Sequence, residues 1–206
     1  MLDNLLFGIQ TNGIMHAFAD GMPPVLERFR MAKEAGVFDY VDKTPDPDQI
    51  ADFEKALHAN MLTPIMLMKH TLPHMIDRGW GRVVNIASAH GLTASPFKSA
   101  YVAAKHGIVG FTKVTALEMA GKGVTCNAVC PGYVLTPLVE AQIPDTMKEY
   151  GMDRETVIRE VMLARQPSKE FATVEQLGGT VNFLCSDAAA QITGTTISVD
   201  GGWTAL

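Results

Sequence analysis

Three short apolar runs, separated by long helical patterns, constrain the fold of this 206-residue chain more than any other feature. The runs Arg82–Ala87, Val124–Val129 and Thr195–Val199 predict strands, and the first is almost continuously apolar, as in a strand buried on both faces. Helices are predicted over Ala100–Ala120 and Thr173–Cys185. Strands that alternate with helices indicate an α/β fold with a parallel sheet covered on both faces. Ligands of such sheets bind beyond the carboxyl ends of the strands.

Two helical patterns add detail to this fold. A long helix is predicted over Gln49–Arg78, where Pro64 and Pro73 should bend or interrupt it. The next predicted helix has an apolar side made of Val102, Ile108, Val109, Phe111, Val114 and Leu117.

Composition excludes several classes of protein. The formal net charge of −5 gives no electrostatic footprint for a nucleic-acid partner. No stretch reaches the roughly 20 apolar residues that a membrane helix needs, and the N-terminus lacks the basic segment of a secretory signal. Three cysteines form no disulfide framework. We therefore expect a cytoplasmic protein with neither a membrane nor a nucleic-acid partner.

Tyr101 and Lys105 are the sharpest chemical feature of the sequence. Four positions apart on a predicted helix, their side chains project from the same face. An ammonium beside a phenol favours the phenolate, which makes the pair a candidate general base near neutral pH. A YxxxK pattern alone is weak, because chance pairs on a helix surface are common.

The context of this pair is far more specific. Ser88 lies 13 positions before Tyr101 at the end of a predicted buried strand, and Asn60 lies 41 positions before it. Pro131–Pro137 follows the next strand, and Asp200-Gly201-Gly202 follows the last. In this order and spacing, residues 56–206 resemble the short-chain dehydrogenase/reductase family. The resemblance implies an NAD-dependent oxidoreductase with a Rossmann-like doubly wound parallel sheet, truncated or altered in its N-terminal half.

The family's catalytic roles transfer to matching positions. Tyr101 resembles the general acid/base, Lys105 the residue that promotes the phenolate and holds the nicotinamide ribose, and Ser88 the hydroxyl that positions the substrate oxygen. Asn60 resembles the helix residue that supports a water in the proton relay; the alternative is a polar residue that bends the helix. The implied cofactor-binding residues are Tyr101, Lys105, Pro131, Gly132, Val134 and Thr136.

The substrate is implied by a narrower resemblance. The segments NIASAHGLTASPFKSAYVAAKHG and CPGYVLTPLVEAQI resemble the branch of this family that acts on 3-hydroxybutyrate. In that branch a histidine, a lysine and a glutamine hold the substrate carboxylate, and they match His90, Lys98 and Gln142. Tyr133 stands where the branch often has tryptophan, so an aromatic wall of different size is expected. The alternatives are a loop histidine and a solvated lysine.

The N-terminal part departs from the family pattern. The glycine-rich turn TGxxxGxG, which would hold the pyrophosphate against a helix N-terminus, is missing. Residues 1–55 are instead predicted to be an atypical βαβ-like segment. Leu5–Asp52 resembles the opening of a sugar isomerase-like TIM barrel, although so short a segment cannot form one. Reduced cofactor affinity is expected.

Two other possibilities remain beside the enzyme. The chain could be a non-catalytic remnant that only folds and assembles, since the family forms dimers or tetramers through helices that are kept here. A sugar isomerase would need metal ligands around a full barrel, which the sequence lacks. His70 and His74 lie four apart on a helix, but without an HExxH pattern and with Pro73 between them, no metal site is expected.

Overall fold

The structure is a computed structural model that describes residues 47–206, with side chains from Ala51 onward. Residues 51–206 form one compact unit. The predicted boundary near residue 55 stays a prediction, and the expectations for residues 1–46 lie outside the described residues. None of the helices in the described part combines the length and the hydropathy that a membrane-spanning segment requires.

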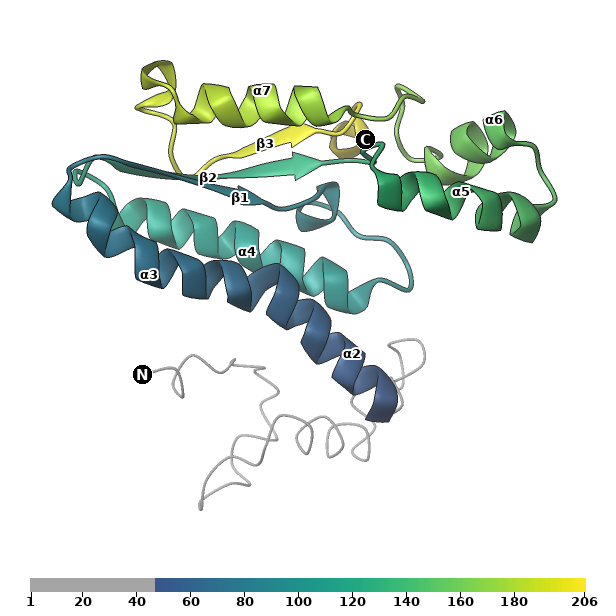
Figure 1. The fold of residues 1–206 in the computed structure, drawn as a ribbon, viewed down its shortest axis with the longest axis horizontal. Helices are drawn as coiled ribbons and strands as arrows, with labels where there is room; N and C mark the ends of the chain where they lie inside the picture. Colours follow the sequence, from purple (N-terminus) through teal and green to yellow (C-terminus); the bar gives the residue numbers. More distant parts are fainter. Residues whose placement is uncertain (1–46) are drawn as a thin grey trace. The chain divides into compact units, whose positions relative to one another are not determined.

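A parallel three-stranded sheet forms the centre of the unit (Figure 1). The strands β1 (Gly81–Ile86), β2 (Val124–Pro131) and β3 (Thr196–Val199) lie in the order β1-β2-β3. The register pairs Gly81 with Val124 and Ala128 with Thr196. Every residue of β2 is buried, as expected of the central strand. The three predicted strands are confirmed.

Helices cover both faces of the sheet, which confirms the predicted fold class (Figure 1). On one face, α3 (Thr63–Asp77) and α4 (Ser99–Glu118) pack on a core that includes Val83, Ile108 and Cys126. On the other face, α7 (Val174–Cys185) packs on a core that includes Val129 and Leu184. A capping box of Thr173 and Gln176 fixes the start of α7. Three short 3-10 helices complete the unit, η3 (Ala89–Gly91), η5 (Asp187–Ala189) and η6 (Trp203–Ala205).

The long predicted helix is interrupted near its first proline. It consists of α2 (Pro47–Leu57), a π-helical turn η2 (His58–Leu62) and α3. Pro64 has no N–H to donate to the carbonyl of Asn60, so the regular ladder is lost just ahead of it. Pro73 lies inside α3, which continues past it.

The helix α4 buries only part of the apolar side that its pattern predicted. Ile108 and Val109 are buried, and Phe111 packs against the same core. Val114 is 51% exposed and Leu117 is 78% exposed. The buried side also carries Thr112, Thr115 and smaller residues. Thr112 is tolerated there because its hydroxyl donates to the carbonyl of Ile108 and accepts from buried Asn85. The prediction for Val114 and Leu117 was therefore wrong.

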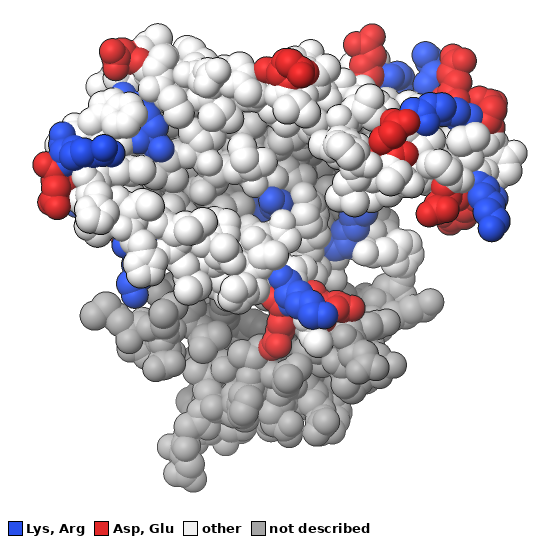
Figure 2. All heavy atoms as spheres, viewed as in Figure 1, with Lys and Arg blue, Asp and Glu red and all other residues white. Residues whose placement is uncertain are grey.

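A small helical subassembly follows β2. It contains α5 (Pro137–Tyr150), α6 (Arg154–Thr156) and the π-helical turn η4 (Val157–Met162). Ile143, Val157 and Met162 form its own core. Figure 2 shows that charged side chains gather over α5 and α6 on the face drawn.

Candidate active site

The carboxyl ends of the three strands place the predicted motifs along one edge of the sheet. Ser88 follows β1, Gly132 follows β2 and Asp200 follows β3. The Ala87 amide donates to the Val129 carbonyl at 2.7 Å, so the ladder holds the first two strand ends together. Parallel pairing explains why residues far apart in sequence meet here.

Tyr101 and Lys105 lie together on α4, as their spacing predicted. The Lys105 Nζ atom is 5.4 Å from the centroid of the Tyr101 ring. Lys105 is only 8% exposed, and its Nζ donates to the carbonyl oxygen of Ile86 at 2.9 Å. Burial lowers the pKa of the Lys105 ammonium, and the neighbouring Cys130 partly offsets this. The carbonyl thus aims a partly desolvated cation at the tyrosine.

Ser88 is held by the turn that it begins. Its backbone is extended, and its Oγ accepts a hydrogen bond from the His90 amide at 3.1 Å. The hydroxyl proton of Ser88 makes no hydrogen bond with the described residues, so it is available to a ligand oxygen. Burial raises the pKa of the adjacent Cys130 thiol, an effect that the Ser88 backbone N–H partly offsets.

His90 lies against Tyr101 and is 5% exposed. The ring centroids of His90 and Tyr101 are 5.9 Å apart, with the edge of one ring toward the face of the other. The His90 Nε2 atom is 2.9 Å from the hydroxyl of Ser95. Burial lowers the pKa of His90, and the charges of Lys98, Arg165 and His106 lower it further. The imidazole is therefore neutral near pH 7.

Trp203 is a site residue that the sequence analysis missed. The centroid of its ring is 5.0 Å from that of His90 and 6.0 Å from that of Tyr133. The rings of Trp203 and Tyr133 are stacked, with an angle of 11° between their planes. Asp200 holds η6 in place, because its carboxylate accepts hydrogen bonds from the amides of Gly202 and Thr204. The Asp200-Gly201-Gly202 motif was the available signal, since a tight turn there brings the following residue back to the sheet edge.

Four other predicted site residues lie at the start of α4, on α5 and in the segment between β2 and α5. Lys98 is exposed at the N-terminal end of α4, and Gln142 is exposed on α5. The hydroxyl of Thr136 caps α5 by accepting from the Val139 amide at 3.3 Å. Val134 forms a bridge with Ala172 after β2 has ended. No hydrogen bond or ring contact within residues 51–206 joins Lys98 or Gln142 to Tyr101.

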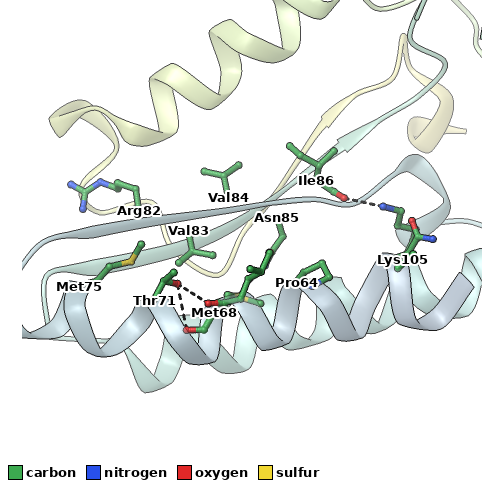
Figure 3. A pocket seen from close by; sticks show the side chains of 13 residues that line it. Pro64, Met68, Thr71, Met75, Arg82, Val83, Val84, Asn85, Ile86 and Lys105 are labelled. Carbon is green, nitrogen blue, oxygen red and sulfur yellow. Dashed lines mark hydrogen bonds between the residues drawn. The ribbon is translucent and has the colours of Figure 1, made fainter. Parts of the chain in front are cut away.

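Asn60 lies in the π-helical turn and lines a pocket of about 370 Å³ beside β1. Its amide donates to the Ala56 carbonyl at 3.0 Å. Figure 3 shows Met68 and Thr71 of α3 facing β1, and Lys105 reaching the Ile86 carbonyl at the end of the strand. This position fits both interpretations of Asn60. It lies at a helix irregularity, as a helix-bending residue would, and it lines the same pocket as Lys105, as a proton-relay residue would. His70 and His74 are exposed on α3.

Gln166 supports the loop that follows β2. It is 1% exposed, and its Oε1 accepts from the Tyr133 amide at 3.1 Å while its Nε2 donates to the Glu170 carbonyl. A Cβ added at Gly132 would clash with Oε1 and crowd the Cα atom of Asp200, so this close approach favours glycine. The buried Gln166 side chain thus supplies the hydrogen-bond partners of the Tyr133 amide and the Glu170 carbonyl.

Replacing Gln166 by methionine is expected to lower the free energy of unfolding by about 1–3 kcal/mol, because the Tyr133 N–H and the Glu170 carbonyl lose their partner in a buried place. Urea denaturation measures this change. Gln142→Met, on an exposed side chain, should change stability by no more than about 0.5 kcal/mol. Equal effects of the two substitutions would contradict the supporting role of Gln166.

The residues fit the nicotinamide end of a dinucleotide. An ammonium has three donors, and Lys105 uses one of them within the described residues, which leaves two for hydroxyl groups of a ribose. Ser88 begins the turn after β1, and the Tyr101 ring contacts His90 of that turn, at the strand ends where α/β proteins bind nucleotides. Such a set can exchange a proton with an alcohol or a carbonyl oxygen.

Comparisons with known proteins agree with this class of site. Residues 31–204 match the family described as Enoyl-(Acyl carrier protein) reductase. A D-beta-hydroxybutyrate dehydrogenase of Rhizobium meliloti (strain 1021) is 52% identical over 191 residues, which are 91% of this chain and 73% of that protein. One from Cupriavidus necator is 52% identical over 146 residues, 71% of this chain and 57% of that protein.

A solved structure is also similar. The structure of 4-hydroxyisoleucine dehydrogenase complexed with NADH has a TM-score of 0.65 and 30% identity, and the match covers 75% of this chain and 60% of that one. The chain belongs to the short-chain dehydrogenase/reductase family. Its resemblance to two D-beta-hydroxybutyrate dehydrogenases makes it, by similarity, an enzyme of the oxidoreductase class.

Proposed function

We propose that this chain is an NAD-dependent oxidoreductase that interconverts 3-hydroxybutyrate and acetoacetate. The observation that carries the proposal is the buried Lys105 ammonium, held by the Ile86 carbonyl and set 5.4 Å from the Tyr101 ring, beside Ser88 and His90. The names of the relatives from Rhizobium meliloti and Cupriavidus necator support the substrate.

In the oxidation, Tyr101 takes the hydroxyl proton of the substrate as a general base. The ammonium of Lys105 stabilises the phenolate that makes this transfer possible, and the Ser88 hydroxyl donates to the substrate oxygen and fixes its position. A bound nicotinamide supplies the acceptor for the hydride that leaves C3. In the reverse direction Tyr101 returns the proton to the oxygen of the ketone.

The carboxylate of the substrate would lie near His90. The positive charges of Lys98 and Arg165 both act on the His90 ring, so this side of the site favours an anion. Lys98 and Gln142 would complete the carboxylate site, and Tyr133 stacked on Trp203 would form an apolar wall for the methyl group.

The proposed cofactor contacts concentrate at the nicotinamide end. Lys105 and Tyr101 would meet the ribose, Pro131–Val134 would line the ring, and Thr136 at the start of α5 would meet a phosphate. The sequence lacks TGxxxGxG, so the pyrophosphate has no glycine-rich cradle and a high KM for NAD is expected. A homo-oligomer is the proposed assembly.

The proposal is tested by following NADH formation by the full chain with 3-hydroxybutyrate, at NAD concentrations raised to the millimolar range. We expect turnover that depends on both compounds, and lower kcat/KM with 2-butanol, which lacks the carboxylate. Absence of turnover by folded protein would contradict the proposal and favour the alternative, a chain that folds and assembles without catalysis.

A further inference from the structure

His90 faces the site with one ring nitrogen already engaged. Its Nε2 atom is 2.9 Å from the Ser95 hydroxyl, and within residues 51–206 its Nδ1 atom has no hydrogen-bond partner. A neutral imidazole has one N–H, so the group that meets Nε2 decides whether Nδ1 is a donor or an acceptor. Only a donor can hold a carboxylate.

The surroundings of His90 favour the neutral ring with an anion beside it. Lys98 and Arg165 are cations, and the charges of both lower the pKa of the ring. The rings of Tyr101 and Trp203 lie edge-to-face against the His90 ring, with centroid distances of 5.9 and 5.0 Å. Because Lys98 and Arg165 both carry a positive charge, they favour a neutral imidazole and an anionic ligand beside it.

Ser95 is itself held in place across the site. The Arg165 Nη1 atom donates to the carbonyl of Ala94 at 2.7 Å, which ties the segment after η4 to the loop that carries Ser95. A serine hydroxyl can donate or accept, and this one is directed at Nε2 by the anchored loop. Arg165 therefore holds the Ala94–Ser95 segment, and the Ser95 hydroxyl in turn contacts the imidazole of His90.

We propose that Ser95 is a positioning residue that donates its hydroxyl proton to His90 Nε2, so that Nδ1 carries the N–H and donates to the substrate carboxylate. This role rests on the proposed function, since it assigns the carboxylate specificity of that site to a residue outside it. Ser95 does not touch the substrate and acts through His90.

The tautomer of His90 can be measured without turnover. In the full chain with ¹⁵N-labelled histidine, long-range ¹H–¹⁵N spectra at pH 7 distinguish Nδ1–H from Nε2–H, and the His90 signal is assigned by its loss in His90→Gln. We expect Nδ1–H in the natural chain and in Ser95→Thr, and substantial Nε2–H in Ser95→Ala. Nε2–H in the natural chain, or an unchanged tautomer in Ser95→Ala, would overturn the proposal.

The same signal reports carboxylate binding. Titration with 3-hydroxybutyrate should shift it, with affinity about 10- to 100-fold weaker in Ser95→Ala, the loss expected for one hydrogen bond to a charged group. Ser99→Ala, on an exposed serine at the start of α4, is the matched control and should bind normally. The methyl ester of 3-hydroxybutyrate should be turned over equally by the natural chain and Ser95→Ala.

The outcomes separate the two claims. Equal losses for acid and ester in Ser95→Ala would overturn the role of Ser95 while leaving the proposed function intact. If neither compound is turned over by the natural chain, the proposed function fails, and the tautomer and titration results still decide the role of Ser95.

Discussion

Replacing Tyr101 by phenylalanine is expected to lower kcat/KM for 3-hydroxybutyrate by about 10²–10⁴-fold, the range lost when a positioned general base is removed. Only the hydroxyl is deleted, and the ring that contacts His90 remains. The free energy of unfolding should therefore stay close to that of the natural chain. Steady-state kinetics and urea denaturation measure the two quantities.

Tyr150→Phe is the matched control for this substitution. Tyr150 ends α5 and is 50% exposed, so loss of its hydroxyl should leave both kcat/KM and stability unchanged. If Tyr101→Phe kept full activity, another group would have to accept the proton, and the assignment of Tyr101 as the general base would be wrong.

Replacing Lys105 by methionine is expected to lower kcat/KM by at least about 10³-fold, because both the stabilisation of the phenolate and the proposed contact with the ribose are lost. Stability should hold or rise, since methionine fills the buried space without the cost of a desolvated ammonium. Lys113→Met, on an exposed lysine of α4, is the control and should keep activity.

The free energy of unfolding should also depend on pH differently in the natural chain and in Lys105→Met. Burial lowers the pKa of Lys105 in the folded state. Between that lowered pKa and the reference of about 10.4, the unfolded chain binds more protons than the folded one, so the free energy of unfolding rises with pH. Lys105→Met should lose this rise. Parallel pH profiles of the two proteins would contradict the buried, cationic state of Lys105.

The part of the site that rests on short-range geometry could be predicted from the sequence. Tyr101 and Lys105 share a helix face because they lie four positions apart, and Ser88 begins the turn of His90 because a buried parallel strand ends just before it. The same regularities of period and strand order gave the sheet and its helices.

The rest depended on packing that no local pattern records. Trp203 reaches the site only because Asp200 folds the chain back after β3, and Ser95 meets His90 through an irregular loop. On α4, hydropathy indicated that Val114 and Leu117 would be buried, but the side of the helix against the sheet accommodates Thr112 through a hydrogen bond to Asn85. A pattern of apolar residues cannot predict burial of two polar side chains that hydrogen-bond to each other.

The most direct test of the account is hydride transfer itself. The full chain is incubated with NAD and 3-hydroxybutyrate deuterated at C3, and the reduced cofactor is examined by mass spectrometry. We predict that the deuterium appears in the reduced nicotinamide, and that Tyr101→Phe slows its appearance. Folded protein that forms no reduced cofactor, or reduced cofactor without deuterium, would contradict the account.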